Sequence, residues 1–233
     1  MFSYYMLRLL RCQPIYKYHM NQYKTVQFKF SDQAWAWLTA FFEPIIDEYQ
    51  KSAAQISALV TFKDHEYQQL VQSSAWSELT TFLQIYQIDD PYPQLFIYKR
   101  LPRPREVMLG NPHIDTTGEG GIAVDVPTRF NILMQGDENT EMVWWNHDRT
   151  SPAVASSTFI RPDGKPVGRL QAVGETLKEK WAAAGEPITR STSLAKKQEY
   201  ASFVRTDILH ALNWTGANPR LILSVRSTRP WQF

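Results

Sequence analysis

Two histidines and one aspartate, separated by a long stretch of chain, constrain the fold more than any other feature of this sequence. His113 and Asp115 are two residues apart, and His210 follows 95 residues after Asp115 (210 − 115). Side chains of a strand alternate between its faces, so His113 and Asp115 point the same way and can reach one metal ion. If His210 is the third ligand, the fold must bring back a distant strand, as barrels and jelly rolls do.

The residue types indicate which metal and which co-substrate such a site would take. Two imidazoles and one carboxylate, with the remaining positions open, form the facial triad suited to iron(II) that binds a co-substrate and oxygen together. Alternation along the last apolar run, 220–226, puts Arg220, Ser224 and Arg226 on one face. An arginine inside an apolar strand indicates a buried anionic ligand, because its planar guanidinium matches a carboxylate.

These residues resemble the motif of the iron(II)/2-oxoglutarate-dependent oxygenases. The run His113-Ile-Asp115, then His210, then an arginine ten residues later (220 − 210), is similar to that family's metal ligands and co-substrate anchor. The resemblance covers roughly residues 94–228. It implies a mainly β fold with flanking helices, built on a double-stranded β-helix, which is a jelly-roll or cupin-like core.

The resemblance also implies roles for individual side chains. His113, Asp115 and His210 would hold iron(II), and an arginine would clamp the distal carboxylate of the co-substrate 2-oxoglutarate. Arg220 and Arg226 compete for that role, and the family spacing favours Arg220. The expected further contacts to the co-substrate come from Ser224, Tyr98 and Asn131.

Chain length and the motif spacing predict the domain organisation. A chain of 233 residues, 43% of them hydrophobic, is large enough for one well-buried domain. We expect a helical region at 1–90 that supports a jelly-roll catalytic core at 91–233. The gap between Asp115 and His210 is longer than in compact members of the family, which implies an insertion at about 147–198.

Charge and cysteine content narrow the setting of the protein. The net charge is only +2 and the charges are interspersed, which argues against a nucleic-acid partner. The sole cysteine, Cys12, cannot form an internal disulfide, which fits a reducing cytoplasm, where iron(II) would survive. No run approaches the roughly 18 apolar residues of a membrane span, so no membrane partner is expected. The oligomeric state stays unknown.

Periodicity predicts helices followed by short strands. Helices are expected at 31–57, with Ser31 or Asp32 as N-cap and Pro44 as a kink or break, at 65–86 and at 175–184. Strands are expected near 95–99, 105–115, 120–134, 140–146, 156–161, 200–212 and 220–227. Their short lengths favour a double-sheet jelly roll over a parallel α/β sheet. The adjacent Trp144 and Trp145 are expected to pack in the core rather than to form a stacking platform.

The sequence therefore predicts an enzyme, an iron(II)- and 2-oxoglutarate-dependent dioxygenase. It would hydroxylate an unactivated C–H bond and release succinate and CO2. The expected substrate is an amino acid or an amino-acyl side chain, because the strand pair after the first two ligands looks most like small-molecule and amino-acyl hydroxylases. Two alternatives stay open: a nucleic-acid demethylase of the same chemistry, which needs a basic groove and a pocket for a flipped base, and a non-catalytic cupin-like binding module.

Overall fold

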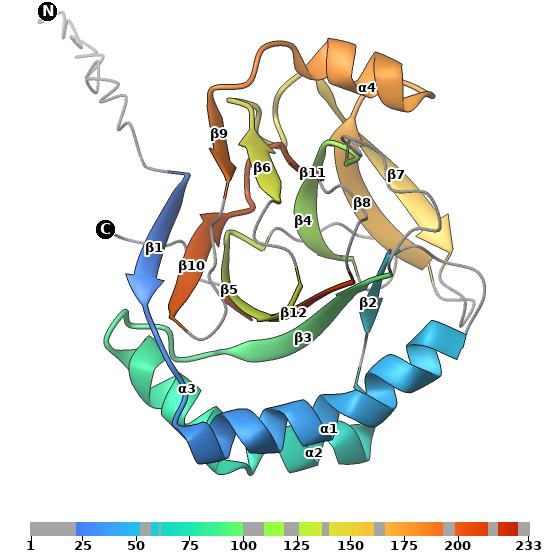
Figure 1. The fold of residues 1–233 in the computed structure, drawn as a ribbon. Coiled ribbons are helices and arrows are strands. Elements are labelled where there is room, and N and C mark those ends of the chain that lie inside the picture. The colour runs from blue at the N-terminus through green and yellow to red at the C-terminus, as the bar shows by residue number, and fades with distance from the viewer. Residues whose placement is uncertain are drawn as a thin grey trace, which may run out of the picture.

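Two antiparallel sheets face each other and form the two layers of the core. The computed structural model describes residues 22–51, 57–60, 62–99, 110–118, 126–136, 140–160, 166–192, 199–213 and 219–227. Six described strands form each sheet, and their pairings are antiparallel. Figure 1 shows the two sheets opposite one another, with helices outside them. This arrangement is a double-stranded β-helix, so the predicted mainly β, jelly-roll fold is confirmed.

The first sheet is covered by three helices. Its strands, in spatial order, are β1 (Tyr23–Gln27), β10 (Tyr200–Arg205), β5 (Thr128–Gln135), β12 (Arg220–Ser227), β3 (Tyr92–Tyr98) and β2 (Ser57–Val60). The helices that cover its outer face are α1 (Asp32–Lys51), α2 (Asp64–Val71) and α3 (Ser74–Gln84) (Figure 1). Leu95 and Ile97 of β3 are buried in one cluster with Leu38 of α1 and Leu79 of α3. The alternate side chains of β3 consequently point toward the second sheet.

The second sheet carries one helix on its outer side. Its strands, in spatial order, are β7 (Val154–Ile160), β8 (Pro166–Ala172), β4 (His113–Gly118), β11 (His210–Asn213), β6 (Glu141–Trp144) and β9 (Thr189–Thr192). Trp145 packs edge-on against Trp181 of α4 (Leu177–Ala184), with ring centroids 4.9 Å apart. Trp144 stacks instead on Tyr23 at 5.6 Å. Both tryptophans are fully buried, as the sequence predicted.

Local capping explains where two of the helices begin. Ser31 is the N-cap of α1, since its Oγ accepts a hydrogen bond from the Ala34 N–H at 3.2 Å. α1 continues through Pro44 to Lys51, so Pro44 does not divide the helix, and the predicted kink stays a prediction. The predicted helix at 65–86 is two helices, because Ser73 begins a new one by accepting from the Trp76 N–H at 3.1 Å. None of the described helices is long and apolar enough to cross a membrane.

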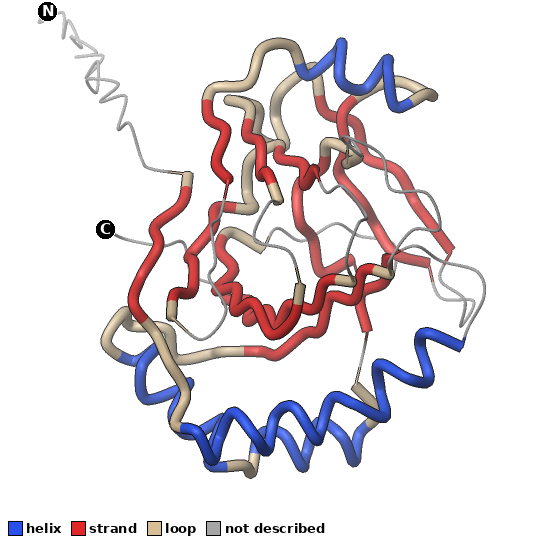
Figure 2. Tube along the Cα trace, in the orientation of Figure 1, coloured by secondary structure: helices blue, strands red, loops and turns tan. Residues whose placement is uncertain are grey.

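Several strands join the sheets from segments expected to be helical or inserted. Figure 2 shows β1 and β2, from within 1–90, at the two edges of the first sheet. The segment 147–198 supplies β7, β8, α4 and β9, and β9 pairs directly with β6. The parts of the predicted strands at 105–109 and 120–125 lie outside the described residues. The division of the chain at residue 90 stays a prediction.

Candidate active site

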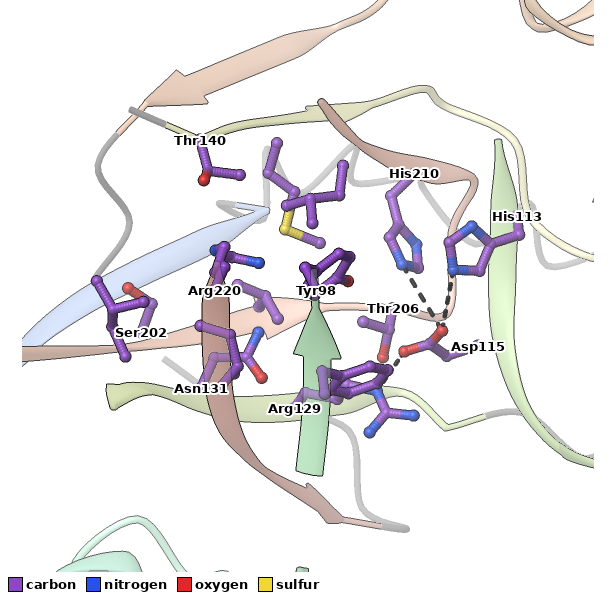
Figure 3. Close-up of a pocket in the computed structure, with 16 residues that line it drawn as sticks. Tyr98, His113, Asp115, Arg129, Asn131, Thr140, Ser202, Thr206, His210 and Arg220 are labelled. Carbon is purple, nitrogen blue, oxygen red and sulfur yellow. Dashed lines mark hydrogen bonds and ion pairs between the residues drawn. The ribbon is translucent and has the colours of Figure 1, made fainter. Parts of the chain in front are cut away.

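The inner faces of the two sheets line a cavity of about 100 Å³. Figure 3 shows the cavity, with His113, Asp115 and His210 together on one side of it and Arg220 on the other. The wall between them is largely apolar and includes Phe96, from β3. The three candidate metal ligands and the candidate anchor for an anion therefore line one cavity.

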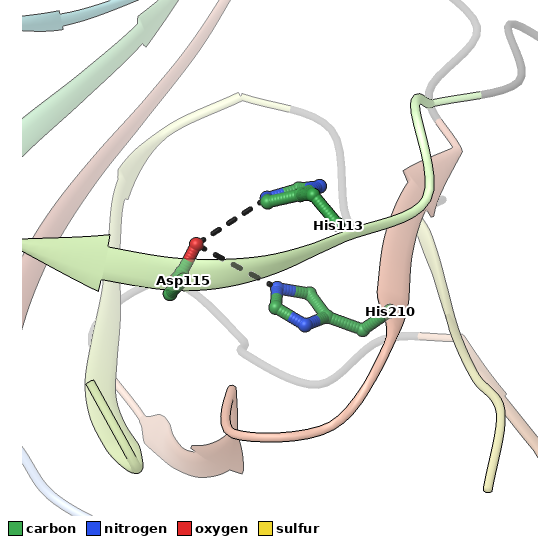
Figure 4. Close-up of side chains that lie close together, drawn as sticks. All are labelled: His113, Asp115 and His210. Atoms are coloured by element: carbon green, nitrogen blue, oxygen red, sulfur yellow. Dashed lines mark ion pairs between the residues drawn. The ribbon is translucent and has the colours of Figure 1, made fainter. Parts of the chain in front are cut away.

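Strand pairing brings the two histidines together across the 95-residue gap. His210 of β11 is the register partner of His113 of β4, and the two ring centroids are 4.6 Å apart. Asp115 lies two residues along β4, on the same face as His113. Figure 4 shows the three side chains converging, and their ligand atoms all lie within 4.8 Å of one another. The structure thus brings together the three residues that the sequence singled out as metal ligands.

Each imidazole is held in one orientation by a backbone carbonyl. His113 Nδ1 lies 2.6 Å from the Asn111 carbonyl oxygen, and His210 Nδ1 lies 2.9 Å from the Ile208 carbonyl oxygen. A carbonyl oxygen can only accept, so each Nδ1 must carry the hydrogen. In the neutral ring the other nitrogen, Nε2, then presents a lone pair, which is the form that ligates a metal.

Asp115 Oδ1 lies at a distance from each imidazole nitrogen that suits two ligands of a single ion. His113 Nε2 and His210 Nε2 lie 3.3 Å and 3.8 Å from Asp115 Oδ1. Ligands at roughly 2.1 Å from one metal are at most roughly 4.2 Å apart, so both separations fit. Two lone pairs directed at a carboxylate oxygen repel one another unless a cation lies among them. The residues present therefore fit a divalent metal held by two imidazoles and one carboxylate.

Burial keeps His210 in the ligating form. Its side chain is only 4% exposed, and removal from water lowers the pKa of His210 to about 4, with the nearby His113 contributing in the same direction. The ring is consequently neutral at physiological pH.

Arg129 is a buried partner of the cluster that the sequence reasoning missed. Its Nε donates to Asp115 Oδ2, and the side chains of Arg129 and Asp115 are 6% and 13% exposed. Burial alone would raise the pKa of Asp115, but the Arg129 guanidinium and the two imidazoles hold it well below its usual range. A signal was available, since Arg129 begins the apolar strand 129–134, where a charge needs a partner.

Three of the five predicted co-substrate residues line the cavity itself: Arg220, Tyr98 and Asn131. The Arg220 guanidinium carbon lies 5.4 Å from the centre of the Tyr98 ring. Burial raises the pKa of Tyr98, so its phenol stays protonated and can donate a hydrogen bond.

Ser224 and Arg226 lie on β12 with Arg220 but do not line the cavity. Ser224 is fully buried, and its Oγ donates to Asn131 Oδ1 at 2.6 Å, so it supports a residue of the wall. Arg226 is not among the residues that line the cavity, and its guanidinium stacks over Tyr92 at 4.2 Å. The structure therefore separates the two arginines that competed for the anion-binding role.

Ser202 is a second residue of the cavity that the sequence did not single out. It lies on β10 opposite Asn131 in register, and Figure 3 shows it on the Arg220 side of the cavity. Its Oγ is buried and has no hydrogen-bond partner in the described part of the chain. Buried hydroxyls are nearly always hydrogen-bonded, so the Ser202 hydroxyl can bind a water molecule or a polar ligand in the cavity.

The fold is a double-stranded β-helix, and two imidazoles and one carboxylate face its interior. No protein-family model matches the sequence, and no curated protein matches it. Solved structures do match. A non-heme alpha-ketoglutarate-dependent carbocyclase, SnoK from nogalamycin biosynthesis, shares 12% identity and a TM-score of 0.50 over 88% of this chain and 78% of its own.

Two further matches have lower TM-scores. EctD from S. alaskensis, solved with 2-oxoglutarate and 5-hydroxyectoine, has 14% identity and a TM-score of 0.47 over 88% of this chain and 72% of its own. HygX from Streptomyces hygroscopicus, solved with nickel and 2-oxoglutarate, has 7% identity and a TM-score of 0.45 over 88% and 81%. The likeness to SnoK shows that the chain shares the fold of that enzyme, which is the fold that the sequence predicted.

Proposed function

We propose that this protein is an iron(II)- and 2-oxoglutarate-dependent dioxygenase that hydroxylates an unactivated C–H bond and releases succinate and CO2. One observation carries the proposal. The Nε2 atoms of His113 and His210 converge on Asp115 Oδ1, at 3.3 Å and 3.8 Å, inside a cavity that Arg220 also lines. Iron bound there would supply the oxygen-activating chemistry.

The residues of the cavity divide into two groups in this proposal. His113, Asp115 and His210 hold the metal, and Arg220 on the opposite side receives the distal carboxylate of 2-oxoglutarate. Tyr98 supports Arg220, and the Ser202 hydroxyl, which has no partner among the described residues, supplies a further donor. Arg129 donates to Asp115 and Gln94, whereas Arg220 lines the cavity across from the three ligands, so Arg220 is the better-placed guanidinium for the co-substrate.

The proposed substrate is an amino acid or an amino-acyl side chain, either free or in a peptide. A substrate of this class fits a small cavity whose wall includes the apolar side chains of Leu133, Met142 and Ile222. The near-neutral charge of the chain argues against nucleic-acid demethylation, which requires a basic surface for the phosphates. The single cysteine supports a reducing cytoplasm as the proposed location.

Succinate formation tests the proposal without knowledge of the substrate. The protein is incubated with iron(II), ascorbate, oxygen and 2-oxoglutarate, and succinate is measured over time, since related chemistry turns over slowly when uncoupled from substrate. We expect succinate from the wild type and none from His210→Ala or from a zinc-loaded sample. Binding of iron without any succinate, even with pools of amino acids and peptides added, would favour the non-catalytic cupin-like module.

A further inference from the structure

We propose that Arg129 is a positioning residue that restricts Asp115 to a single metal-binding oxygen. This inference rests on the proposed metal site and names a residue that acts through one of its ligands. The two oxygens of Asp115 have different neighbours. Oδ1 faces both imidazoles, whereas Oδ2 accepts a hydrogen bond from Arg129 Nε in an ion pair.

The guanidinium is itself held from three directions. Arg129 Nη1 donates to Gln94 Oε1 at 2.5 Å and lies 3.4 Å from Ser224 Oγ, and the guanidinium carbon lies 5.1 Å from the centre of the Phe96 ring. A planar guanidinium bound at both Nε and Nη1 has a defined plane and position. Arg129 therefore offers Asp115 Oδ2 a fixed donor rather than a mobile counter-charge.

The backbone of Asp115 is fixed as well. Its N–H donates to the Thr206 carbonyl at 3.0 Å, and its own carbonyl accepts from the Val126 N–H at 2.9 Å. With backbone and Oδ2 both held, rotation of the carboxylate that would bring Oδ2 toward the imidazoles must break the contact with Arg129. The structure assigns Oδ1 to the metal and leaves Oδ2 out of its reach.

This restriction matters for the number of open positions on the metal. A carboxylate that binds through both oxygens takes two coordination positions, and one that binds through a single oxygen takes one. The proposed chemistry needs positions for 2-oxoglutarate and oxygen at once. By occupying Oδ2, Arg129 keeps one more position available than the three side chains alone would guarantee.

Arg226 provides a matched control for Arg129. The two arginines are register partners on adjacent strands, and each stacks on an aromatic ring of β3, Tyr92 for Arg226 and Phe96 for Arg129. Arg226 lies outside the cavity lining, whereas Arg129 lines it beside Asp115. Removal of either charge disturbs the same pair of strands, but Arg129 donates to Asp115, whereas Arg226 stacks over Tyr92 away from the cavity lining.

Cobalt(II) is a suitable probe because its visible spectrum depends on coordination number and geometry. The full-length protein is titrated with cobalt(II) without co-substrate, and 2-oxoglutarate is then added to the loaded protein. We expect Arg129→Met to bind cobalt(II) with an altered spectrum and to bind 2-oxoglutarate about 10- to 100-fold more weakly. Arg129→Lys should recover only part of both effects, and Arg226→Met should match the wild type.

Further variants separate a failure of this role from a failure of the metal site. If Arg129→Met does not fold, Gln94→Ala, which removes one support of the guanidinium, should shift the spectrum in the same direction. A wild-type cobalt(II) spectrum in Arg129→Met, or in Gln94→Ala where Arg129→Met does not fold, would overturn the role of Arg129. The metal site itself would stand as long as His210→Ala abolishes the cobalt(II) spectrum. A wild-type spectrum in His210→Ala as well would overturn the metal site and both proposals with it.

Discussion

His113 and His210 are oriented by the same contact, in which Nδ1 lies against the backbone carbonyl of the residue two positions earlier in the chain. The acceptors are Asn111 and Ile208, at 2.6 Å and 2.9 Å. Because the two histidines are also register partners, the pairing of β4 and β11 places both Nε2 atoms near the same oxygen of Asp115. Secondary structure itself thus builds most of the candidate metal site.

The buried pair Asp115–Arg129 predicts a strong energetic coupling in the metal-free protein. Asp115→Leu and Arg129→Met each leave one buried charge without its partner, and each should lower the free energy of unfolding by about 3–5 kcal/mol. The double variant should be far less destabilised than the sum of the two. Urea unfolding of the four proteins measures the coupling. Additive single effects would contradict it, and the more exposed pair Arg205–Asp207 serves as a control with a smaller expected coupling.

We expect the metal-free protein to lose stability in mild acid, because His210 is buried. Its pKa is about 4 in the folded protein and about 6.5 when unfolded, so the unfolded state binds a proton more readily between these values. The neutral, buried His210 therefore contributes its full share to the free energy of unfolding above about pH 6.5. This share, about 3 kcal/mol, is lost as the pH falls through about 4. Unfolding of the metal-free wild type and of His210→Gln at several pH values isolates this effect. Parallel pH profiles for the two proteins would show that His210 does not cause it.

Arg220 and Arg226 should differ in their effect on co-substrate binding. Arg220→Ala removes the guanidinium that lines the cavity and should weaken 2-oxoglutarate binding by about 10- to 100-fold, the loss expected for hydrogen bonds to a charged group. Arg226→Ala should change it far less, since Arg226 stacks over Tyr92 outside the cavity lining. Calorimetric titration of the metal-loaded variants gives both affinities. A larger loss in Arg226→Ala would reassign the anchor.

A side chain at position 110 should weaken metal binding, because Gly110 packs closely against the backbone of β11. A methyl group at Gly110 would overlap the carbonyl oxygen of Leu212 on β11, and the Gly110 N–H donates to Asn213 Oδ1 at 3.1 Å. Gly110→Ala is expected to cost about 1–3 kcal/mol and to displace β4 from β11, which weakens metal binding. Gly185→Ala is the control: its φ of +71° strains any side chain, yet a methyl there meets nothing within 4 Å. It should lower stability and leave metal affinity unchanged.

The sequence predicted the parts of the fold that have a strong local signal. The strand-like runs at 95–99 and 220–227 and the spacing of His113, Asp115 and His210 are visible in the chain, and they led to the prediction of a jelly roll and of a cluster of the three side chains. The strands β8 and β9 were not anticipated, because Pro166 and Gly168 interrupt one and the other is the short polar run Thr189–Thr192. Their partners in the sheet, rather than their own residues, make them strands.

The missed site residues depend on contacts between distant segments. Ser202 becomes informative only once its hydroxyl is seen to be buried and without a partner in the described chain. Arg129 lies 14 residues from Asp115 and 35 from Gln94, so no short motif joins them. Arg129, like Arg220 and Arg226, is an arginine in an apolar strand and therefore needs an anionic partner. Its anion turned out to be one of the candidate metal ligands.

Anaerobic titration of the iron(II)-loaded protein with 2-oxoglutarate tests the central claim most directly. Chelation of iron(II) by the keto acid gives a weak visible charge-transfer band, which requires both the metal and open positions beside it. We predict that the band appears in the wild type, saturates with 2-oxoglutarate and is absent in His210→Ala. Iron binding to the wild type without any such band would contradict the assignment of this cavity to 2-oxoglutarate-dependent chemistry.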